Sequence, residues 1–413
     1  MDLFYAIKEP VSHLVNAMGR TGLKIIPSEQ KGVFMTLFFI IFATITGVGI
    51  VVPLLPIYAH DMGAAGIYVA LIFGAFSLSR TCLLPVFGRM SDRRGRKPFI
   101  LAGLLIYGLI SLAFVFSSRV ETLILARFFQ GMGSAMIMPV VQAYVGEITP
   151  EGTEGYSMGL FNLSMFLSLS LGPLLGGSIL DLWSMDAAFF CMGGLSLLAF
   201  GLCLVFLPPP SQEGIPRGER VELPWKTLMG DWGFRGLLSF RYVYTACIGT
   251  IWCFLPLYAD QAFGLTGTQI GFLVMLGVFI SGLLQLPMGY LADRADKRRM
   301  GFVGGIVAAL GMGVIFKSHT FVGLLMGVSV FGIGGGIGMP AVTALAVIYG
   351  EAKGAMGTVM SVMTVAHSLG MLTGSLAAGI AMDALALHHA FVLAGALMVL
   401  GTGIFYICQS RQP

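Results

Sequence analysis

Long apolar segments separated by short polar loops run along the whole chain. Each is long enough to cross the hydrocarbon core of a bilayer as a helix, which takes about 20 mostly apolar residues. None shows the alternation over about ten residues that is typical of strands in a membrane barrel. The pattern predicts an all-α membrane protein with twelve transmembrane helices, near residues 33–58, 66–88, 98–117, 121–143, 157–180, 187–207, 236–259, 268–290, 300–317, 320–347, 355–380 and 388–408.

The second half of the chain repeats the first. Segment 55–59 (LPIYA) returns as 255–259 (LPLYA), and Asp181 at the end of the fifth span matches Asp383 at the end of the eleventh. Six spans per half give both halves the same orientation, an arrangement in which the substrate site lies near the bilayer midplane between them. We therefore expect two six-helix bundles, 33–207 and 235–410, joined by a linker, 208–234, that contains three successive prolines.

The first 32 residues do not read as a cleavable signal, because Glu9, Pro10 and Arg20 interrupt the apolar stretch. Apolar residues recur in it at helical spacing, which predicts a helix lying on the inner membrane surface. The alternative for this segment is a partly disordered tail.

Composition and charge agree with a membrane protein and indicate its orientation. Hydrophobic residues make up 56% of the chain, charged residues only 11%, and the net charge is +4. Most lysines and arginines fall in loops on the side of both termini, which the positive-inside rule places in the cytoplasm. The protein is therefore expected in the cytoplasmic membrane with both termini cytoplasmic, and its positive charge reports topology rather than nucleic-acid binding.

No catalytic or cofactor-binding pattern stands out. The six cysteines form no CxxC pair, so neither a disulfide framework nor a metal site is indicated. The chain shows no nucleophile–base set, metal cluster or phosphate-binding loop. We expect no enzyme activity and no cofactor.

A short basic loop occurs twice, at 88–97 (GRMSDRRGRK) and at 289–299 (GYLADRADKRR). Glycine lets two membrane helices approach closely, and Asp92 is expected near the start of the third span, where a helix N-terminus favours negative charge. The arginines could pair with acidic groups and form a latch between helix ends; the alternative is anchoring to anionic lipid. The candidate latch residues are Gly88, Asp92, Arg93, Gly95, Arg96, Asp293 and Arg294.

These motifs make the chain resemble the major facilitator superfamily over all twelve spans. Loop 88–97 is similar to the family signature between spans two and three, and segment 125–133 (LARFFQGMG) resembles the span-four signature of its proton-driven members. Span five resembles the antiporter signature, with Ser168 where glycine is usual. The combined pattern is similar to the twelve-helix drug:proton antiporters, which implies alternating access. In span five the residues expected to bend the helix and pack it at the interface between the halves are Gly172, Pro173, Gly176 and Gly177.

Two arginines lie inside predicted spans, where a charge is costly and usually faces a partner or a cavity. Resemblance to the span-four signature assigns Arg127 to coupling, although snorkelling to the surface is an alternative. The side chain of Arg80 could reach the inner surface of the membrane. Alternatively, it could face the cavity and hold an anionic group of the substrate. The first span carries no carboxylate inside it, so the candidate proton carriers are Glu147 and His367, with a packing histidine as the alternative for the latter.

In this family spans four, five, seven and eight line the central cavity. The polar or amphipathic residues on them, together with Arg80, are the candidate cavity residues: Gln130, Gln142, Tyr144, Asn162, Trp252 and Gln285. An apolar cavity with a few amides and aromatic rings suits a lipophilic solute, but no acid is available to attract a cation.

Three functions compete. The first is proton-coupled export of lipophilic compounds by a monomer that needs only its substrate, protons and membrane lipids. The second is export or facilitated transport of an anionic metabolite or lipid-like molecule, favoured if Arg80 and Arg127 both face the cavity. The third, a non-transporting sensor or assembly protein, predicts degenerate motifs or an added soluble domain, and neither is present.

Overall fold

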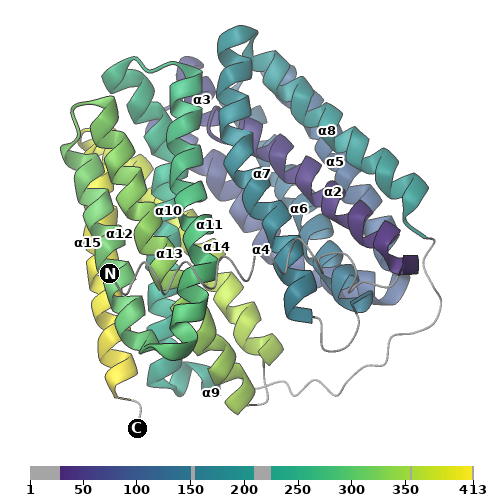
Figure 1. The fold of residues 1–413 in the computed structure, drawn as a ribbon. Helices are drawn as coiled ribbons and strands as arrows, with labels where there is room; N and C mark the ends of the chain where they lie inside the picture. The colour runs from purple at the N-terminus through teal and green to yellow at the C-terminus, as the bar shows by residue number, and fades with distance from the viewer. Residues whose placement is uncertain (1–27, 150–153, 209–224, 354–355, 412–413) are drawn as a thin grey trace.

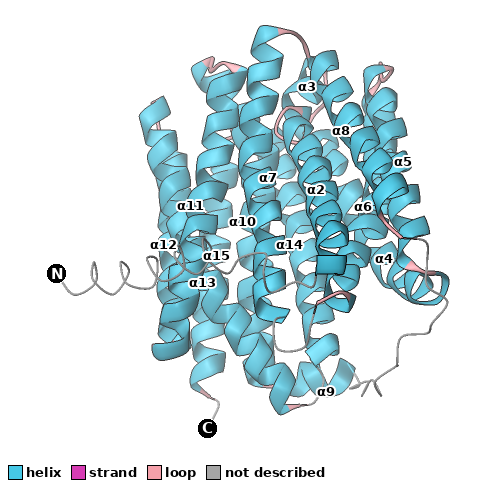
Figure 2. Ribbon diagram, turned by 45° about the vertical axis from the view of Figure 1, so that its right-hand side comes forward, coloured by secondary structure: helices cyan, strands magenta, loops and turns pink. Residues whose placement is uncertain are grey.

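The computed structural model describes residues 28–149, 154–208, 225–353 and 356–411, and every regular element in these ranges is a helix (Figure 2). The all-α prediction is confirmed for this part of the chain. The first half contains α2 (Ser28–Val51), α3 (Leu55–Asp61), α4 (Gly66–Arg94), α5 (Arg96–Val115), α6 (Val120–Glu147), α7 (Glu154–Leu182) and α8 (Met185–Phe206). The second half contains α9 (Trp225–Gly230), α10 (Trp232–Phe263), α11 (Gly267–Arg294), α12 (Lys297–Lys317), α13 (Phe321–Ala352), α14 (Met356–Ala384) and α15 (His389–Ser410).

The described residues contain 12 helical segments long and apolar enough to cross a membrane, as predicted. The first span differs from the expected continuous helix, because α2 ends at Val51 and α3 begins at Leu55. Pro53 lies in the intervening turn and Pro56 opens α3. Proline has no N–H to donate and clashes with the preceding turn, which accounts for the break.

The helices form two bundles that lie side by side (Figure 1). In the first bundle α2 packs on α7 and α8, α4 on α6, and α5 on α6 and α8. In the second, α10 packs on α14 and α15, α12 on α13 and α15, and α11 on α13. The two bundles meet mainly where α4 packs against α14 and where α7 packs against α11.

The helix boundaries shift the predicted limits slightly. Helix α2 already begins inside the predicted N-terminal segment, at Ser28, and α9 with the first turn of α10 falls inside the predicted linker. Residues 1–27 and 209–224 lie outside the described ranges, and with them the predicted surface helix and most of the linker.

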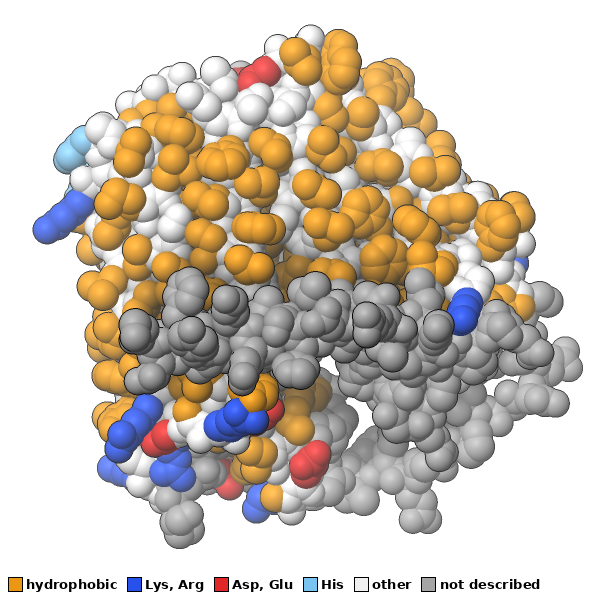
Figure 3. Space-filling model, viewed as in Figure 1, with side chains coloured by type: hydrophobic (Ala, Val, Ile, Leu, Met, Phe, Trp, Pro, Cys, Tyr) orange, Lys and Arg blue, Asp and Glu red, His pale blue; other side chains and the backbone are white. Residues whose placement is uncertain are grey.

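The bundles have two distinct ends. We call the end at which α2 begins and α15 ends the termini side, and the end that carries α3 and the start of α4 the distal side (Figure 1). On the face drawn in Figure 3, apolar side chains cover the middle of the molecule and charged side chains gather toward the termini side. This distribution is the one expected for a protein embedded in a bilayer.

Glycines allow several helices to touch backbone to backbone. A Cβ atom built at Gly304 of α12 would lie 2.5 Å from the Cα atom of Gly338 on α13, and one built at Gly332 would lie 2.6 Å from the carbonyl oxygen of Gly277 on α11. Association of helices in lipid depends on such close packing, because lipid tails supply no hydrophobic drive. The glycine-rich tenth span therefore packs tightly against two neighbours.

Candidate functional site

A cavity of about 610 Å³ lies between the two bundles, at the level of Arg80, the midpoint of α4. Its walls come chiefly from α2, α4, α6 and α7 on one side and from α10, α11, α13 and α14 on the other. Most of the lining side chains are apolar or aromatic. None of the described residues that line it is an aspartate or a glutamate.

Several predicted residues line this cavity. They comprise four candidate cavity residues and two coupling candidates: Arg80, Gln142, Trp252, Gln285, Arg127 and His367. Arg80 and Arg127 both reach the cavity wall. This is the arrangement that, on the sequence alone, would favour an anionic substrate.

Three predicted cavity residues lie elsewhere. Gln130 is buried behind the wall, where its amide contacts Arg127 and Met192. Tyr144 packs against the apolar core of the first bundle. Asn162 is exposed, one turn nearer the termini side than Phe166. Each of the three residues lies on the expected helix. Its position around the helix axis or along the helix keeps its side chain away from the cavity wall.

Arg127 is buried in the first bundle rather than snorkelling to the surface, with 3% of its surface exposed. Its Nη1 donates to Oε1 of Gln130 at 2.6 Å, and its guanidinium lies over the Phe76 ring at 4.5 Å. Its Nε donates a long hydrogen bond, 3.4 Å, to the carbonyl oxygen of Ile72. These partners are all neutral, so Arg127 brings a positive charge to the cavity wall that they do not cancel.

A second group of basic side chains, two arginines and a histidine, spans the interface between the bundles. Arg80 comes from α4, Arg241 from α10 and His367 from α14, and both guanidiniums act electrostatically on the imidazole. Nε of each arginine and Nδ1 of His367 are buried and have no hydrogen-bond partner among the described residues. Buried polar atoms are normally paired, so this group has donors to offer a ligand.

Sequence reasoning missed Arg241. Because the seventh span was predicted to begin at 236, Arg241 looked like a charge at the border of the membrane. Helix α10 begins at Trp232, which puts Arg241 in the third turn of a long helix. The signal that could have found it was a positive charge beyond the first turn of an apolar run.

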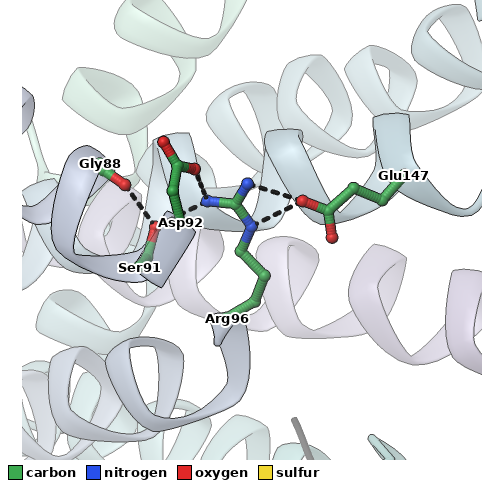
Figure 4. A network of polar contacts seen from close by, with 5 residues as sticks. All are labelled: Gly88, Ser91, Asp92, Arg96 and Glu147. Atoms are coloured by element: carbon green, nitrogen blue, oxygen red, sulfur yellow. Dashed lines mark hydrogen bonds and ion pairs between the residues drawn. The ribbon is translucent and has the colours of Figure 1, made fainter. Parts of the chain in front are cut away.

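The first basic loop forms an ion-pair network on the termini side (Figure 4). Arg96, at the start of α5, contacts Asp92 Oδ1 at 2.5 Å and Glu147 Oε1 at 2.6 Å. It also donates to Oγ of Ser91 at 2.7 Å, and that hydroxyl donates to the carbonyl oxygen of Gly88. The network ties the ends of α4, α5 and α6 together inside the first bundle.

The positions of three residues correct the expectations for this loop. Asp92 belongs to the last turn of α4 rather than to the start of the third span, because α4 continues to Arg94. A Cβ atom built at Gly88 would meet nothing within 4 Å, so none of the described helices approaches it closely in this conformation. Glu147, expected among the coupling groups, does not line the cavity and instead joins the Arg96 network.

Gly95 sets the corner between α4 and α5. Its φ of 88° is a conformation that side chains with a Cβ atom rarely adopt. The neighbouring Arg93 and Arg94 are exposed, where they can meet lipid headgroups or solvent.

The second basic loop is built differently. Asp296 caps α12 by accepting from the backbone N–H of Arg298 at 2.9 Å. Arg294 lies over the ring of Tyr290 at 3.9 Å, and Asp293 is exposed. A Cβ atom built at Gly289 would meet nothing within 4 Å. Both loops thus sit at termini-side helix ends that are not pressed against the other bundle at their glycines.

On the distal side, by contrast, the bundles touch backbone to backbone. A Cβ atom at Gly177 of α7 would overlap the carbonyl oxygen of Gly267 at the start of α11, and one at Gly271 would overlap that of Pro173. The other two glycines of the motif face within the first bundle, Gly172 against Gly49 and Gly176 against the backbone of α2. The motif therefore packs α7 on α2 and on α11 at once.

A pair of aspartates completes the distal contact. Asp181, near the end of α7, accepts from the N–H groups of Gly267 and Thr268 at the start of α11, both at 2.7 Å. Asp383, near the end of α14, accepts from those of Gly66 at 2.7 Å and Ile67 at 2.9 Å at the start of α4. Free N–H groups and the helix dipole make such N-termini favourable for a carboxylate. We call this pair the aspartate clasps; the sequence repeat predicted their equivalence but not their role.

We expect neutralising the termini-side network to slow transport without unfolding the protein. Asp92→Asn and Glu147→Gln each remove one of the partly exposed anions that hold Arg96, so the helix ends lose an ion pair that contributes about 0.2–1 kcal/mol. Initial rates of substrate uptake into proteoliposomes measure the effect, and size-exclusion chromatography controls for folding. Glu121→Gln, at the distal start of α6, is the matched control. Wild-type rates for both variants would leave only membrane anchoring for this loop.

Comparisons with known proteins agree with this architecture. The family model described as Major Facilitator Superfamily matches residues 37–260 and 242–413. An uncharacterised MFS-type transporter of Methanocaldococcus jannaschii is 29% identical over 92% of this chain and 99% of its own length. Multidrug resistance protein 2 of Bacillus subtilis is 27% identical over 93% and 97%.

The fold is also that of solved transporters. A bacterial homologue of the human lysosomal transporter Spinster, in an inward-facing, unoccupied conformation, superposes with a TM-score of 0.82 at 12% identity, over 93% of this chain and 98% of that one. The family match to both halves, the twelve spans and the two facing bundles lead to one conclusion: this chain belongs to the Major Facilitator Superfamily.

Proposed function

We propose that the protein exports lipophilic small molecules from the cytoplasm by alternating access, with protons as the coupling ion. The observation that carries the proposal is the central cavity, enclosed by two related bundles and shut on the distal side by backbone contacts and the aspartate clasps. A single site that two rigid halves can expose to either side is the basis of alternating access in such folds.

The cavity suits a compound of drug size. Its volume of about 610 Å³ lies within the range of about 300–1,000 Å³ typical of small-molecule sites. Aromatic and thioether side chains such as Phe76, Phe166, Trp252 and Met165 supply an adaptable apolar wall. Multidrug resistance protein 2 of Bacillus subtilis, similar over nearly the whole chain, supports export of such compounds.

The distribution of lysine and arginine supports a cytoplasmic location for the termini side. With this orientation, closure of the distal side supports assigning the structure to the state that loads substrate from the cytoplasm. Exposed Asn162 and the unobstructed glycines Gly88 and Gly289 support an opening on that side. In the opposite state the aspartate clasps would separate and the two basic loops would approach the other bundle.

Coupling to protons requires a group that changes charge during the cycle. Histidine ordinarily does so between about pH 5 and 8, and His367 is the one histidine among the described residues that line the cavity; none of these residues is an acid. Arg127 stays in the proposal as a fixed charge on the same wall.

The experiment is uptake of a fluorescent lipophilic compound into proteoliposomes, with and without an imposed pH gradient. We expect His367→Gln to retain uptake without the gradient and to lose the acceleration by it, because glutamine keeps a polar group but cannot bind a proton. His319→Gln, in a distal loop, is the matched control. If the gradient accelerates uptake fully in the His367 variant, this residue is excluded as the proton carrier. If the gradient accelerates uptake in neither the wild-type protein nor the variant, proton coupling is excluded.

A further inference from the structure

The geometry points to amphipathic organic anions as the substrates: a lipophilic body that carries a carboxylate, sulfonate or phosphate group. This inference rests on the proposed transport function and names the substrate class of the same cavity. It depends on the charges of the described lining residues, on their spare donors and on the distribution of polar and apolar wall.

The charge of the wall has one sign. Arg80, Arg127 and Arg241 all line the cavity, and the described lining residues include no carboxylate. Charges interact more strongly where protein and lipid exclude water than they do in bulk solvent. A cationic solute would therefore be repelled by three guanidiniums, whereas an anion would neutralise part of their charge.

The donors available to an anion come from both bundles. Arg127 is already engaged by Gln130, but Nε of Arg80 and Nε of Arg241 are buried and have no hydrogen-bond partner among the described residues. Within the part of the chain that the structure describes, the guanidinium of Arg241 makes one long contact, 3.6 Å from Nη1 to the sulfur of Met339. Guanidinium groups match carboxylate and phosphate oxygens in a two-pronged geometry. An anionic group between α4 and α10 would thus bind the first bundle to the second.

The remainder of the wall accommodates the lipophilic body. Phe76 on α4, Phe166 on α7 and Trp252 on α10 line the same cavity as the two arginines. Burial of apolar surface against these rings contributes affinity in proportion to the area covered. A wall with cationic groups and an aromatic lining is the arrangement expected for a molecule with one anionic end.

The test compares three probes with the same fluorescent tail: a dansyl-labelled fatty acid, its methyl ester and its trimethylammonium analogue. Binding is measured by fluorescence titration of the full-length protein in detergent, at neutral pH. We expect the carboxylate to bind more tightly than the ester, and the ester more tightly than the cation. Equal affinity for the three probes, or the reverse order, would overturn the inference.

Substitution of the arginines sharpens this test. Arg80→Gln and Arg241→Gln are each expected to weaken binding of the carboxylate roughly 10- to 100-fold, the range for one charge-assisted hydrogen bond, and to leave the ester within about twofold. Arg299→Gln, whose side chain is 81% exposed on the termini side, is the matched control. Unchanged affinity for the carboxylate probe in a variant that carries both Arg80→Gln and Arg241→Gln would overturn the inference.

Two further variants keep the outcome interpretable if an arginine is needed for folding. Arg80→Lys retains the charge without the two-pronged geometry, and an intermediate affinity for the carboxylate is expected. Ser281→Glu places an anion on the wall, and the preference should move toward the trimethylammonium probe. Retained preference for the carboxylate in the Ser281 variant would contradict the charge argument.

These experiments distinguish failure of the proposed transport function from failure of the proposed substrate class. Counterflow of the probes in proteoliposomes reports whether any of them is moved. Movement of the ester or the cation with exclusion of the carboxylate would overturn the inference and leave the transport proposal standing. If none of the probes moves while detergent binding keeps the predicted order, the proposed transport function fails and the assigned ligand class remains.

Discussion

Replacing both aspartate clasps by alanine is expected to open the distal side and to shift the protein strongly toward the opposite conformation. Asp181 and Asp383 each accept two backbone N–H groups at the start of a helix of the other bundle. Loss of one such cap costs about 1–2 kcal/mol. The double variant should therefore change the conformational equilibrium by about 2–4 kcal/mol, roughly 30- to 1,000-fold.

A native thiol reports this opening. Cys253 on α10 is fully buried, and its Sγ lies 3.7 Å from the carbonyl oxygen of Val69 on α4, across the contact between the bundles. In a variant that keeps only this cysteine, the alkylation rate with a maleimide should rise in the Asp181→Ala, Asp383→Ala protein. Asp186→Ala, in the first turn of α8 on the same side, is the control. An unchanged rate would show that the clasps do not hold the distal side closed.

Gly177→Val is expected to abolish transport by preventing closure of the same side. A Cβ atom at this position would overlap the backbone of Gly267, and backbone cannot move aside as a flexible side chain can. Overpacking typically costs about 1–3 kcal/mol, and the upper end applies here, so the closed state should be depleted roughly 100-fold.

The readout is gradient-driven uptake of the dansyl fatty acid into proteoliposomes, with monodispersity on size-exclusion chromatography as the folding control. Gly403→Val is the matched variant, because a Cβ atom built at Gly403 of α15 meets nothing within 4 Å. We expect the Gly403 variant to transport at the wild-type rate. Wild-type uptake by the Gly177 variant would mean that the observed closure is not a step of the cycle.

The sequence predicts the architecture well because its signals are long and repeated. Twelve apolar runs indicate twelve spans, and the match of Asp181 with Asp383 in the repeat anticipates two equivalent positions at the ends of spans, although not their contacts between the bundles. Arg80 and Arg127 were recognisable because a charge inside an apolar run is rare. These properties depend on residue type and spacing alone.

Features that depend on helix limits and rotation could not be predicted in the same way. Arg241 was missed because the start of α10 lies four residues before the predicted one, at Trp232 rather than 236. Gln130 and Glu147 were assigned to the cavity and to coupling, yet nearby arginines engage both of them. Arg127 lies on the same helix as Gln130, whereas Arg96, which holds Glu147, comes from α5. The first contact depends on how α6 is rotated and the second on how two helices pack, and a single sequence reveals neither.

The two ends of the molecule have different kinds of polar contact, and these have different roles in the proposed transport cycle. On the termini side the Arg96 network stays within the first bundle, whereas on the distal side the aspartate clasps join the two bundles. Contacts that break and form between the bundles carry the conformational change, and contacts within a bundle keep each half rigid. The cavity with its arginines lies between these ends and would be exposed to each side in turn.

Counterflow in proteoliposomes tests the central claim most directly, because exchange of labelled for unlabelled compound needs alternating access but no gradient of the coupling ion. Vesicles preloaded with unlabelled dansyl-free fatty acid are diluted into a trace of the dansyl-labelled one, at equal pH on both sides. The account predicts transient accumulation of the label above its level in protein-free vesicles, and none with Gly177→Val. Label uptake equal to that of protein-free vesicles, for this probe and for its ester and trimethylammonium analogues, would contradict the account.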